Sequence, residues 1–429
     1  MIHFFAIVMT GIIFSMYIFP FQFTFFPVGN TKIYIAVVGL FLFGVDLVRK
    51  REFCVDRSMF VISLWAMMVS FCSILSLAYN EATDMAYVSY VVSMWVWLGA
   101  AYTICSLIRW VHTQISVELV CLYFIVICVA QNVFALLNEF VPSFQYIVNS
   151  LVIQQSQDYL EDVDRMYGIG AAFDTAGTRF ACALVMIAYL TVNCIREKKK
   201  EKEVYVFLLI FIFIAIVGSM VARTTLAGLL LALLYWIYDS KIYTFRICGI
   251  YKKIGYALII TMVVCIPLVV FLNTLPEFNK LFRFAFEGFY NLSESGSFET
   301  DSTDILLEMW KHVPNSVKTW IIGDGYFLSP YATNSNYLGI HQYTYYMGVD
   351  VGYLRFIYYF GFIGLFAFIC FFVQCTRTCI EKFHRHRVLF IMILMMNLII
   401  WAKVATDLFC VFALFLAMDY KSSNKSALP

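Results

Sequence analysis

Residues 204–221 read VYVFLLIFIFIAIVGSMV, a run of eighteen residues without a single charged side chain. An α-helix needs about 20 mostly apolar residues to cross the hydrocarbon core of a bilayer. The length and composition of this run therefore predict a transmembrane helix rather than an ordinary helix of a soluble core. The fold of the whole chain depends on how many such runs it contains.

The composition of the chain agrees with this first run. Of the 429 residues, 62% belong to the hydrophobic set AVILMFWYC and only 14% are charged. Soluble domains have about 45–50% apolar and about 25% charged residues, so a water-soluble globular protein is excluded. The net charge of +2 gives no overall basic field that would favour nucleic acid as a partner.

Apolar runs recur along the chain and predict an all-α polytopic integral membrane protein with about 12 transmembrane helices, forming a single transmembrane domain over residues 1–429. The expected spans are 2–19, 33–48, 59–79, 85–107, 117–138, 178–195, 204–221, 225–238, 256–273, 351–374, 388–402 and 403–420.

The positions of the basic residues predict how these spans are oriented. Two thirds of the 30 Lys and Arg residues lie in alternate connectors or in the C-terminal tail. Because cytoplasmic loops carry an excess of Lys and Arg, we expect a multi-pass protein of the cytoplasmic (inner) membrane with both termini in the cytoplasm. Two long extracytoplasmic loops result, the third at 139–177 and the fifth at 274–350, and loops of this length are usually functional or disordered.

The cysteines do not predict a metal centre. None of the thirteen cysteines falls in the long acidic loops, so we expect no disulfide framework. The spacing of Cys375, Cys379, His384 and His386 matches no standard zinc signature. We expect neither a metal nor a cofactor.

Four arginines are expected near the outer face of the membrane. An arginine within hydrocarbon costs about 2.5–3.5 kcal/mol and usually faces the protein interior or a wet cavity. Since the planar guanidinium suits the oxygens of a phosphate or pyrophosphate, we predict a pocket for an anionic lipid headgroup on the outer side. The alternative is that each arginine reaches the interface or pairs locally, as Arg179 could with Asp174. The four are Arg165, Arg179, Arg223 and Arg355.

Tyrosines are concentrated in residues 323–364, GDGYFLSPYATNSNYLGIHQYTYYMGVDVGYLRFIYYFGFIG. Aromatic rings can stack on sugar rings, so the loop part of this segment is a candidate glycan-binding surface. The alternative is an aromatic belt at the membrane–water interface. The candidate glycan-binding residues are Tyr326, Tyr343, Tyr345 and Tyr346.

Asp350 and His341 in the same segment are the candidate catalytic residues. Either side chain could accept a proton from a sugar hydroxyl. Asp350 stands where the expected span at 351–374 begins and is our first choice, although this position would also suit a helix N-cap. His341 lies nine residues upstream and is the second choice.

With these residues the chain resembles the Wzy-type O-antigen and exopolysaccharide polymerases. The topology with two long outer loops resembles theirs, as do RMYGIGAAFDTAGTRFACALVMIAYL at 165–190 and the segment at 323–364. The resemblance implies a glycosyltransferase of polysaccharide and lipopolysaccharide biosynthesis. It would transfer a growing glycan from undecaprenyl pyrophosphate to a sugar hydroxyl of the next lipid-linked repeat unit. The partners implied are undecaprenyl-pyrophosphate-linked oligosaccharides and membrane lipid, with a chain-length regulator and a flippase as further candidates.

Two other functions stay open at this point. The related O-antigen ligases have a histidine near the corresponding turn, which makes a ligase-like glycan transferase the nearest alternative. A flippase or transporter of lipid-linked oligosaccharides is an alternative of another class. A transporter would place polar groups near the bilayer midplane, whereas here they collect on the outer loops.

Overall fold

The computed structural model describes residues 2–26, 29–50, 57–153, 165–197, 201–241, 255, 273–330 and 345–418. The architecture is all-helical, with 77% helix and 2% strand, which confirms the all-α part of the predicted fold class. The only strands in these ranges are β1 (Gln22–Phe23) and β2 (Val152–Ile153), which pair in antiparallel register.

Seven helices in the described residues are long and apolar enough to cross a membrane. They are α2 (Thr31–Lys50), α3 (Arg57–Asn80), α4 (Tyr90–His112), α5 (Val117–Phe140), α8 (Phe173–Arg196), α9 (Glu201–Val221) and α16 (Gly352–Lys382). Each overlaps one of the twelve expected spans. The structure thus fits a membrane-embedded protein, and the full count of about twelve stays a prediction.

The other expected spans correspond to shorter helices or lie outside the described residues. Four of them are α1 (Ile2–Ile18), α10 (Thr225–Ser240), α17 (Arg387–Ile400) and α18 (Phe409–Leu416). At 1.5 Å per residue, α18 is only about 12 Å long and cannot cross a hydrocarbon core of about 30 Å alone. The run at 256–273 lies outside the described residues except for Asn273.

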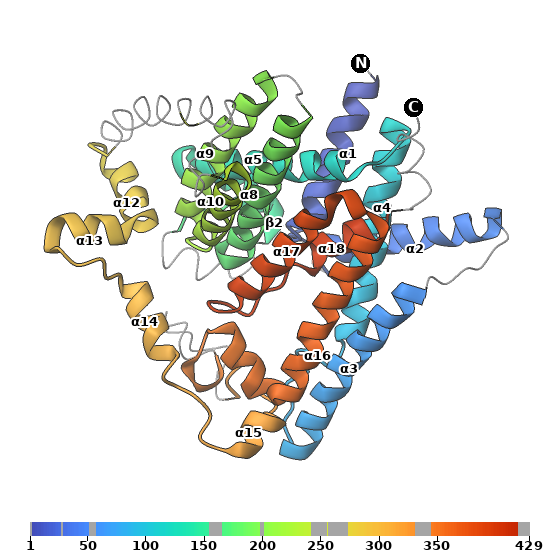
Figure 1. Cartoon of the computed structure of the whole chain (residues 1–429), viewed down its shortest axis with the longest axis vertical. Helices are drawn as coiled ribbons and strands as arrows, with labels where there is room; N and C mark the ends of the chain where they lie inside the picture. The colour runs from blue at the N-terminus through green and yellow to red at the C-terminus, as the bar shows by residue number, and fades with distance from the viewer. Residues whose placement is uncertain are drawn as a thin grey trace. The chain divides into compact units, whose positions relative to one another are not determined.

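The chain forms two compact units (Figure 1). The first unit comprises residues 1–120, 147–164 and 305–429, and the second comprises 121–146 and 165–304. In the first unit α16 runs beside α3, and α4 packs against α1, α2 and α18. Small residues allow close helix contact: a Cβ added at Gly39 of α2 would lie 1.8 Å from the carbonyl oxygen of Gly99 on α4.

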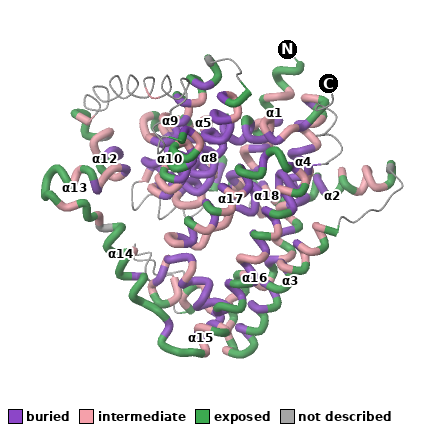
Figure 2. Tube along the Cα trace, viewed as in Figure 1, coloured by how far each residue is buried: buried purple, intermediate pink, exposed green. Residues whose placement is uncertain are grey.

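In the second unit α8 packs against both α9 and α10, and Figure 2 shows α8 as mostly buried. Gly228 of α10 lies so close to α8 that an added Cβ would be 2.3 Å from the Cα of Ala181. The indole of Trp236 donates a 3.1 Å hydrogen bond to the carbonyl of Ala188. The short helices α12 (Pro276–Ala285) and α13 (Glu287–Ser295) follow in the chain, and α6 (Pro142–Leu151) precedes α8.

Loop ends that the charge pattern assigns to one side of the membrane lie together in the first unit. The loop between α3 and α4 and the segment before α16 are both expected outside, and Asp84 of the first accepts hydrogen bonds from the amides of Phe327 and Leu328 in the second. On the side expected to be cytoplasmic, the short helix η4 (His384–His386) follows α16, and its His386 lies 3.5 Å from Glu118 of α5.

Candidate functional site

The candidate site is built around an interruption in α16. At Gly361 the chain has φ +66° and ψ −174°, so the helix is broken within its expected span. A break leaves carbonyl groups without their intrahelical partners, which within a membrane must find others. Here the carbonyls of Tyr358 and Tyr359 accept hydrogen bonds from the amides of Asp324 (2.5 Å) and Gly325 (3.1 Å).

The glycines at this junction permit backbone-to-backbone contact. Gly323 has φ +88°, and a Cβ at this position would lie 2.6 Å from the carbonyl oxygen of Tyr359. A Cβ at Gly361 would lie 2.2 Å from the carbonyl oxygen of Ile321, in the short helix α15 (Val317–Ile321). Glycine is therefore required sterically at 323 and at 361, where the GDG turn at 323–325 crosses the broken helix.

Asp324 anchors this turn through its carboxylate. One oxygen accepts from Lys318 Nζ at 2.5 Å and from the Thr319 hydroxyl at 2.8 Å, and Lys318 also donates to Asn80 Oδ1 at 2.6 Å. The other oxygen is 3.4 Å from the Tyr346 hydroxyl. Burial, together with the nearby carboxylate, raises the pKa of Tyr346 to about 12, so the hydroxyl stays protonated and can donate.

Asp84 holds the segment that follows the turn. Its Oδ2 accepts from the amides of Phe327 at 2.8 Å and Leu328 at 2.9 Å, and its backbone carbonyl accepts from the Tyr359 hydroxyl at 2.8 Å. These bonds fix the position of the Phe327 ring relative to α16. Asp84 could not be identified from the sequence, because nothing in the short loop between α3 and α4 indicates a contact more than 240 residues away in the chain.

Arg355 of α16 lies between two aromatic rings. Its guanidinium carbon is 3.7 Å from the ring centroid of Phe327 and 3.9 Å from that of Tyr345. One terminal nitrogen donates to Asp350 Oδ1 at 3.3 Å and the other to the carbonyl of Phe327 at 3.3 Å. Its side chain is only 8% exposed, and Nε has no partner among the described residues. This geometry favours Arg355 as a residue that positions Asp350.

Asp350 is not the N-cap of α16, so the capping alternative is wrong. The cap position belongs to Val351, without a side-chain hydrogen bond. The Asp350 carboxylate instead faces Arg355 and is 30% exposed. Its backbone amide lies 3.4 Å from Met309 Sδ, at the end of α14 (Asp301–Met309). The carboxylate is thus oriented by a cation and still reachable.

The tyrosines of the predicted glycan-binding set occupy different surroundings. Tyr326 stacks on Tyr346, with ring centroids 5.4 Å apart, and Tyr345 covers Arg355. Tyr343 and the second-choice proton acceptor His341 both lie outside the described residues.

In the second unit, Arg165 and Arg223 share one aromatic ring. Their guanidinium carbons lie 4.9 Å and 4.5 Å from the centroid of Phe284. Arg223 also donates to the Phe284 carbonyl at 2.8 Å and forms a 2.5 Å ion pair with Glu287. Arg165 stacks on Phe173 as well, and no hydrogen bond or ion pair joins it to any residue that the structure describes. Its guanidinium fork is available to an anion.

The other two predicted arginines have different environments. Arg179 is buried, and its NH1 donates to the carbonyl of Thr175 one turn earlier in α8 at 2.5 Å. Arg355 belongs to the first unit, beside Asp350. The structure therefore groups Arg165 with Arg223, and each of the remaining two with other partners.

These features define a multi-helix membrane protein with a broken helix at its candidate site. Two further arginines, Arg165 and Arg223, contact the ring of Phe284. Compared with known proteins, the chain matches no family model, no curated protein and no solved structure.

Proposed function

We propose that the chain is a polymerase of lipid-linked oligosaccharide repeat units in the cytoplasmic membrane. It transfers the growing glycan from undecaprenyl pyrophosphate to a sugar hydroxyl of the next lipid-linked repeat on the outer side. The membrane assignment rests on the seven apolar helices. The reaction rests on the resemblance to Wzy-type polymerases and on the chemistry of the residues below.

The observation that carries the proposal is the Asp350–Arg355 pair at the beginning of an apolar helix. Glycosyl transfer to a hydroxyl needs a group that takes the proton of the acceptor. Asp350 offers a partly exposed carboxylate, and Arg355 holds it from one side while two aromatic rings fix Arg355. The carboxylate is therefore held in one orientation, as a catalytic base requires.

The second part of the proposal concerns the leaving group. When the glycosyl bond breaks, negative charge develops on the pyrophosphate, and a nearby guanidinium stabilises it. Arg165 is suited to this role because its nitrogens have no described partner, and Arg223 lies on the same Phe284 ring. Arginine binds phosphate oxygens in a bidentate manner that lysine cannot reproduce.

Deletion of the gene in the source organism tests the proposal, by the length of surface glycan on gels and the state of the lipid-linked intermediates. Loss of a polymerase leaves single repeat units attached to their final acceptor. Loss of a ligase leaves polymer on the lipid carrier and no glycan attached to the final acceptor. Loss of a flippase leaves single lipid-linked units inside the cell. Either of the last two patterns would refute the polymerase assignment.

The Asp350→Asn variant tests the catalytic residue. Asn keeps the shape of the side chain but cannot accept the proton, so cells carrying this variant should make single repeat units at a normal level of the protein. Asp304→Asn is the matched control, because Asp304 is an exposed carboxylate of the same long loop. Long chains from the Asp350→Asn variant would exclude Asp350 as the base.

A further inference from the structure

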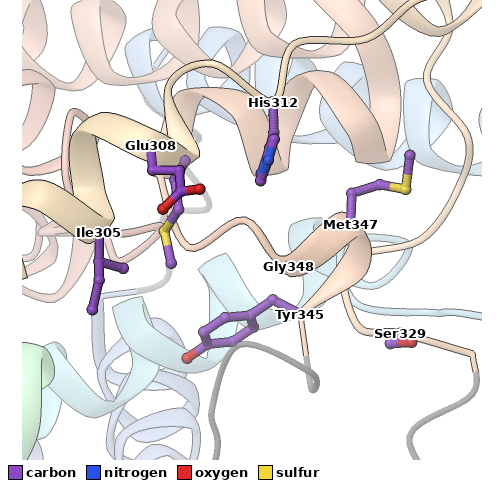
Figure 3. A pocket seen from close by; sticks show the side chains of 8 residues that line it. Ile305, Glu308, His312, Ser329, Tyr345, Met347 and Gly348 are labelled. Atoms are coloured by element: carbon purple, nitrogen blue, oxygen red, sulfur yellow. The ribbon is translucent and has the colours of Figure 1, made fainter.

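A pocket of about 430 Å³ opens in the first unit (Figure 3). It lies beside the Asp350–Arg355 pair, because two of its lining residues contact that pair. This volume lies near the lower end of the range of small-molecule sites, about 300–1,000 Å³, and suits about one or two sugar rings. The side chains around it come from the end of α14 and from the two segments that precede α16. The ones used below are Glu308, Met309, His312, Ser329, Tyr345 and Met347.

Two polar side chains of the pocket lack a hydrogen-bonding partner in the part of the chain that the structure describes. No hydrogen bond or ion pair joins the Glu308 carboxylate or the His312 imidazole to any residue within the described ranges, and both residues are exposed. Their backbone is nevertheless anchored, since the carbonyl of Glu308 accepts from Lys311 and that of His312 accepts from the Tyr358 hydroxyl at 3.0 Å. The two side chains are therefore held over the pocket with their polar atoms open to a ligand.

The pocket shares two residues with the candidate site. Tyr345 lines the pocket and also stacks on Arg355, 3.9 Å from the guanidinium carbon. Met309 lines the pocket and its sulfur lies 3.4 Å from the amide of Asp350. A ligand in the pocket would therefore lie next to the residue proposed to accept the proton.

The lining has the chemistry of a sugar site. Tyr345 supplies an aromatic ring for stacking, Met309 and Met347 supply apolar surface, and the carboxylate, the imidazole and the Ser329 hydroxyl supply hydrogen-bonding groups. The charge of the lining also favours some sugars over others: Glu308 carries a negative charge, and no Lys or Arg is among the lining residues that the structure describes. A second carboxylate or a phosphate would be repelled there.

From these observations we infer that the pocket binds a sugar ring that is uncharged or carries an amino group, and discriminates against uronic acids through Glu308. The inference rests on the proposed function, because the bound sugar would belong to the acceptor repeat unit of that reaction.

Ligand-observed saturation-transfer NMR on the purified full-length protein in detergent tests the pocket without any need for turnover. The probes are methyl glucoside and methyl glucuronide, which differ by one carboxylate. We expect methyl glucoside to bind with a dissociation constant on the order of millimolar, as befits a ligand of about a dozen non-hydrogen atoms. Methyl glucuronide should bind about fivefold more weakly because it meets one like charge.

Two variants, each with a matched control, locate the binding. Tyr345→Ala should weaken binding of methyl glucoside about tenfold, whereas Tyr79→Ala, which removes an exposed ring of α3, should not change it. Glu308→Gln should abolish the fivefold discrimination and leave glucoside binding within about twofold, whereas Glu299→Gln, at an exposed residue outside the pocket lining, should leave the discrimination intact. Glu308 is exposed, so its replacement is not expected to affect folding.

Absence of saturation transfer to methyl glucoside from the folded protein would overturn the inference, as would unchanged binding by Tyr345→Ala. Equal binding of both probes by the unaltered protein would overturn the assignment of Glu308 as the selecting residue. The outcome is separable from the proposed function. If the protein binds the sugar but its deletion leaves glycan length unchanged, the pocket assignment stands and the polymerase assignment is refuted. If the protein does not bind the sugar but its deletion leaves single repeat units, the polymerase assignment stands and the pocket assignment is refuted.

Discussion

Replacing Gly361 by Ala is expected to destabilise the protein strongly, because two separate costs act at this position. The backbone region near φ +66° and ψ −174° is essentially accessible only to glycine, and any other residue costs about 1–3 kcal/mol there. The added Cβ would lie 2.2 Å from the carbonyl oxygen of Ile321, so α15 must move, which costs about 1–3 kcal/mol more. Together they lower the free energy of unfolding by about 2–6 kcal/mol.

The measurement is thermal unfolding of the purified protein in detergent, followed by far-ultraviolet circular dichroism. At about 2 °C per kcal/mol for a chain of this size, the expected decrease in Tm is about 4–12 °C. Gly44→Ala is the matched control: it lies in α2, and no atom lies within 4 Å of its added Cβ. Alanine there should be neutral or stabilising by about 0.5–1 kcal/mol, since glycine weakens a helix interior.

The same variant should also shorten the glycan product, because movement of α15 and the 323–325 turn displaces Phe327 and with it Arg355. An unchanged Tm for Gly361→Ala would mean that the chain relaxes into a continuous helix at little cost. The broken helix would then not be what holds the candidate site in place.

Three further predictions follow from other parts of the molecule. Arg165→Lys and Arg223→Lys should each shorten the glycan at normal protein levels, since lysine lacks the planar fork; full-length product from both would exclude phosphate recognition. Single cysteines at Ser156 and Ser302 in a cysteine-free background should both react with an impermeant maleimide in intact spheroplasts, and a site labelled only after lysis would contradict the topology. Burial lowers the pKa of His386 below its ordinary 6.5, so the unfolded chain binds the proton more readily and stability is lost as the pH falls below about 6.5. His386→Gln should therefore reduce the loss of Tm between about pH 7.5 and about pH 5.5, and an equal loss in both proteins would argue against this residue as its source.

The helices could be predicted from the sequence because their signal is local. Apolar runs determine where helices form in a membrane protein, and each expected span within the described residues overlaps a helix. The interruption of α16 was not predicted, since the apolar run continues through Phe360 and Gly361 without any polar residue or proline. What breaks the helix there is the turn at 323–325, whose amides compete for its carbonyls.

The candidate site was predictable only in part, because only its local contacts leave a signal in the sequence. The proximity of Asp350 to Arg355 is local, and both were identified. The contributions of Asp84, Lys318 and His312 depend on contacts between segments far apart in the chain, such as the bond from the Tyr358 hydroxyl to the carbonyl of His312. Because a single sequence carries no information on such pairs, the sequence points to His341 and not to His312.

The crossing of the GDG turn and the broken helix also bears on how this architecture can change over evolutionary time. The bonds that join the two segments run between backbone groups, so most side chains along these segments can be replaced without breaking them. The glycines at 323 and 361 cannot, because a Cβ at either one would overlap the opposing main chain. Descendants of a common ancestor could therefore lose nearly all recognisable identity and keep this crossing. The spacing of these two glycines, set against an apolar run, is the trait by which such distant relatives should be sought.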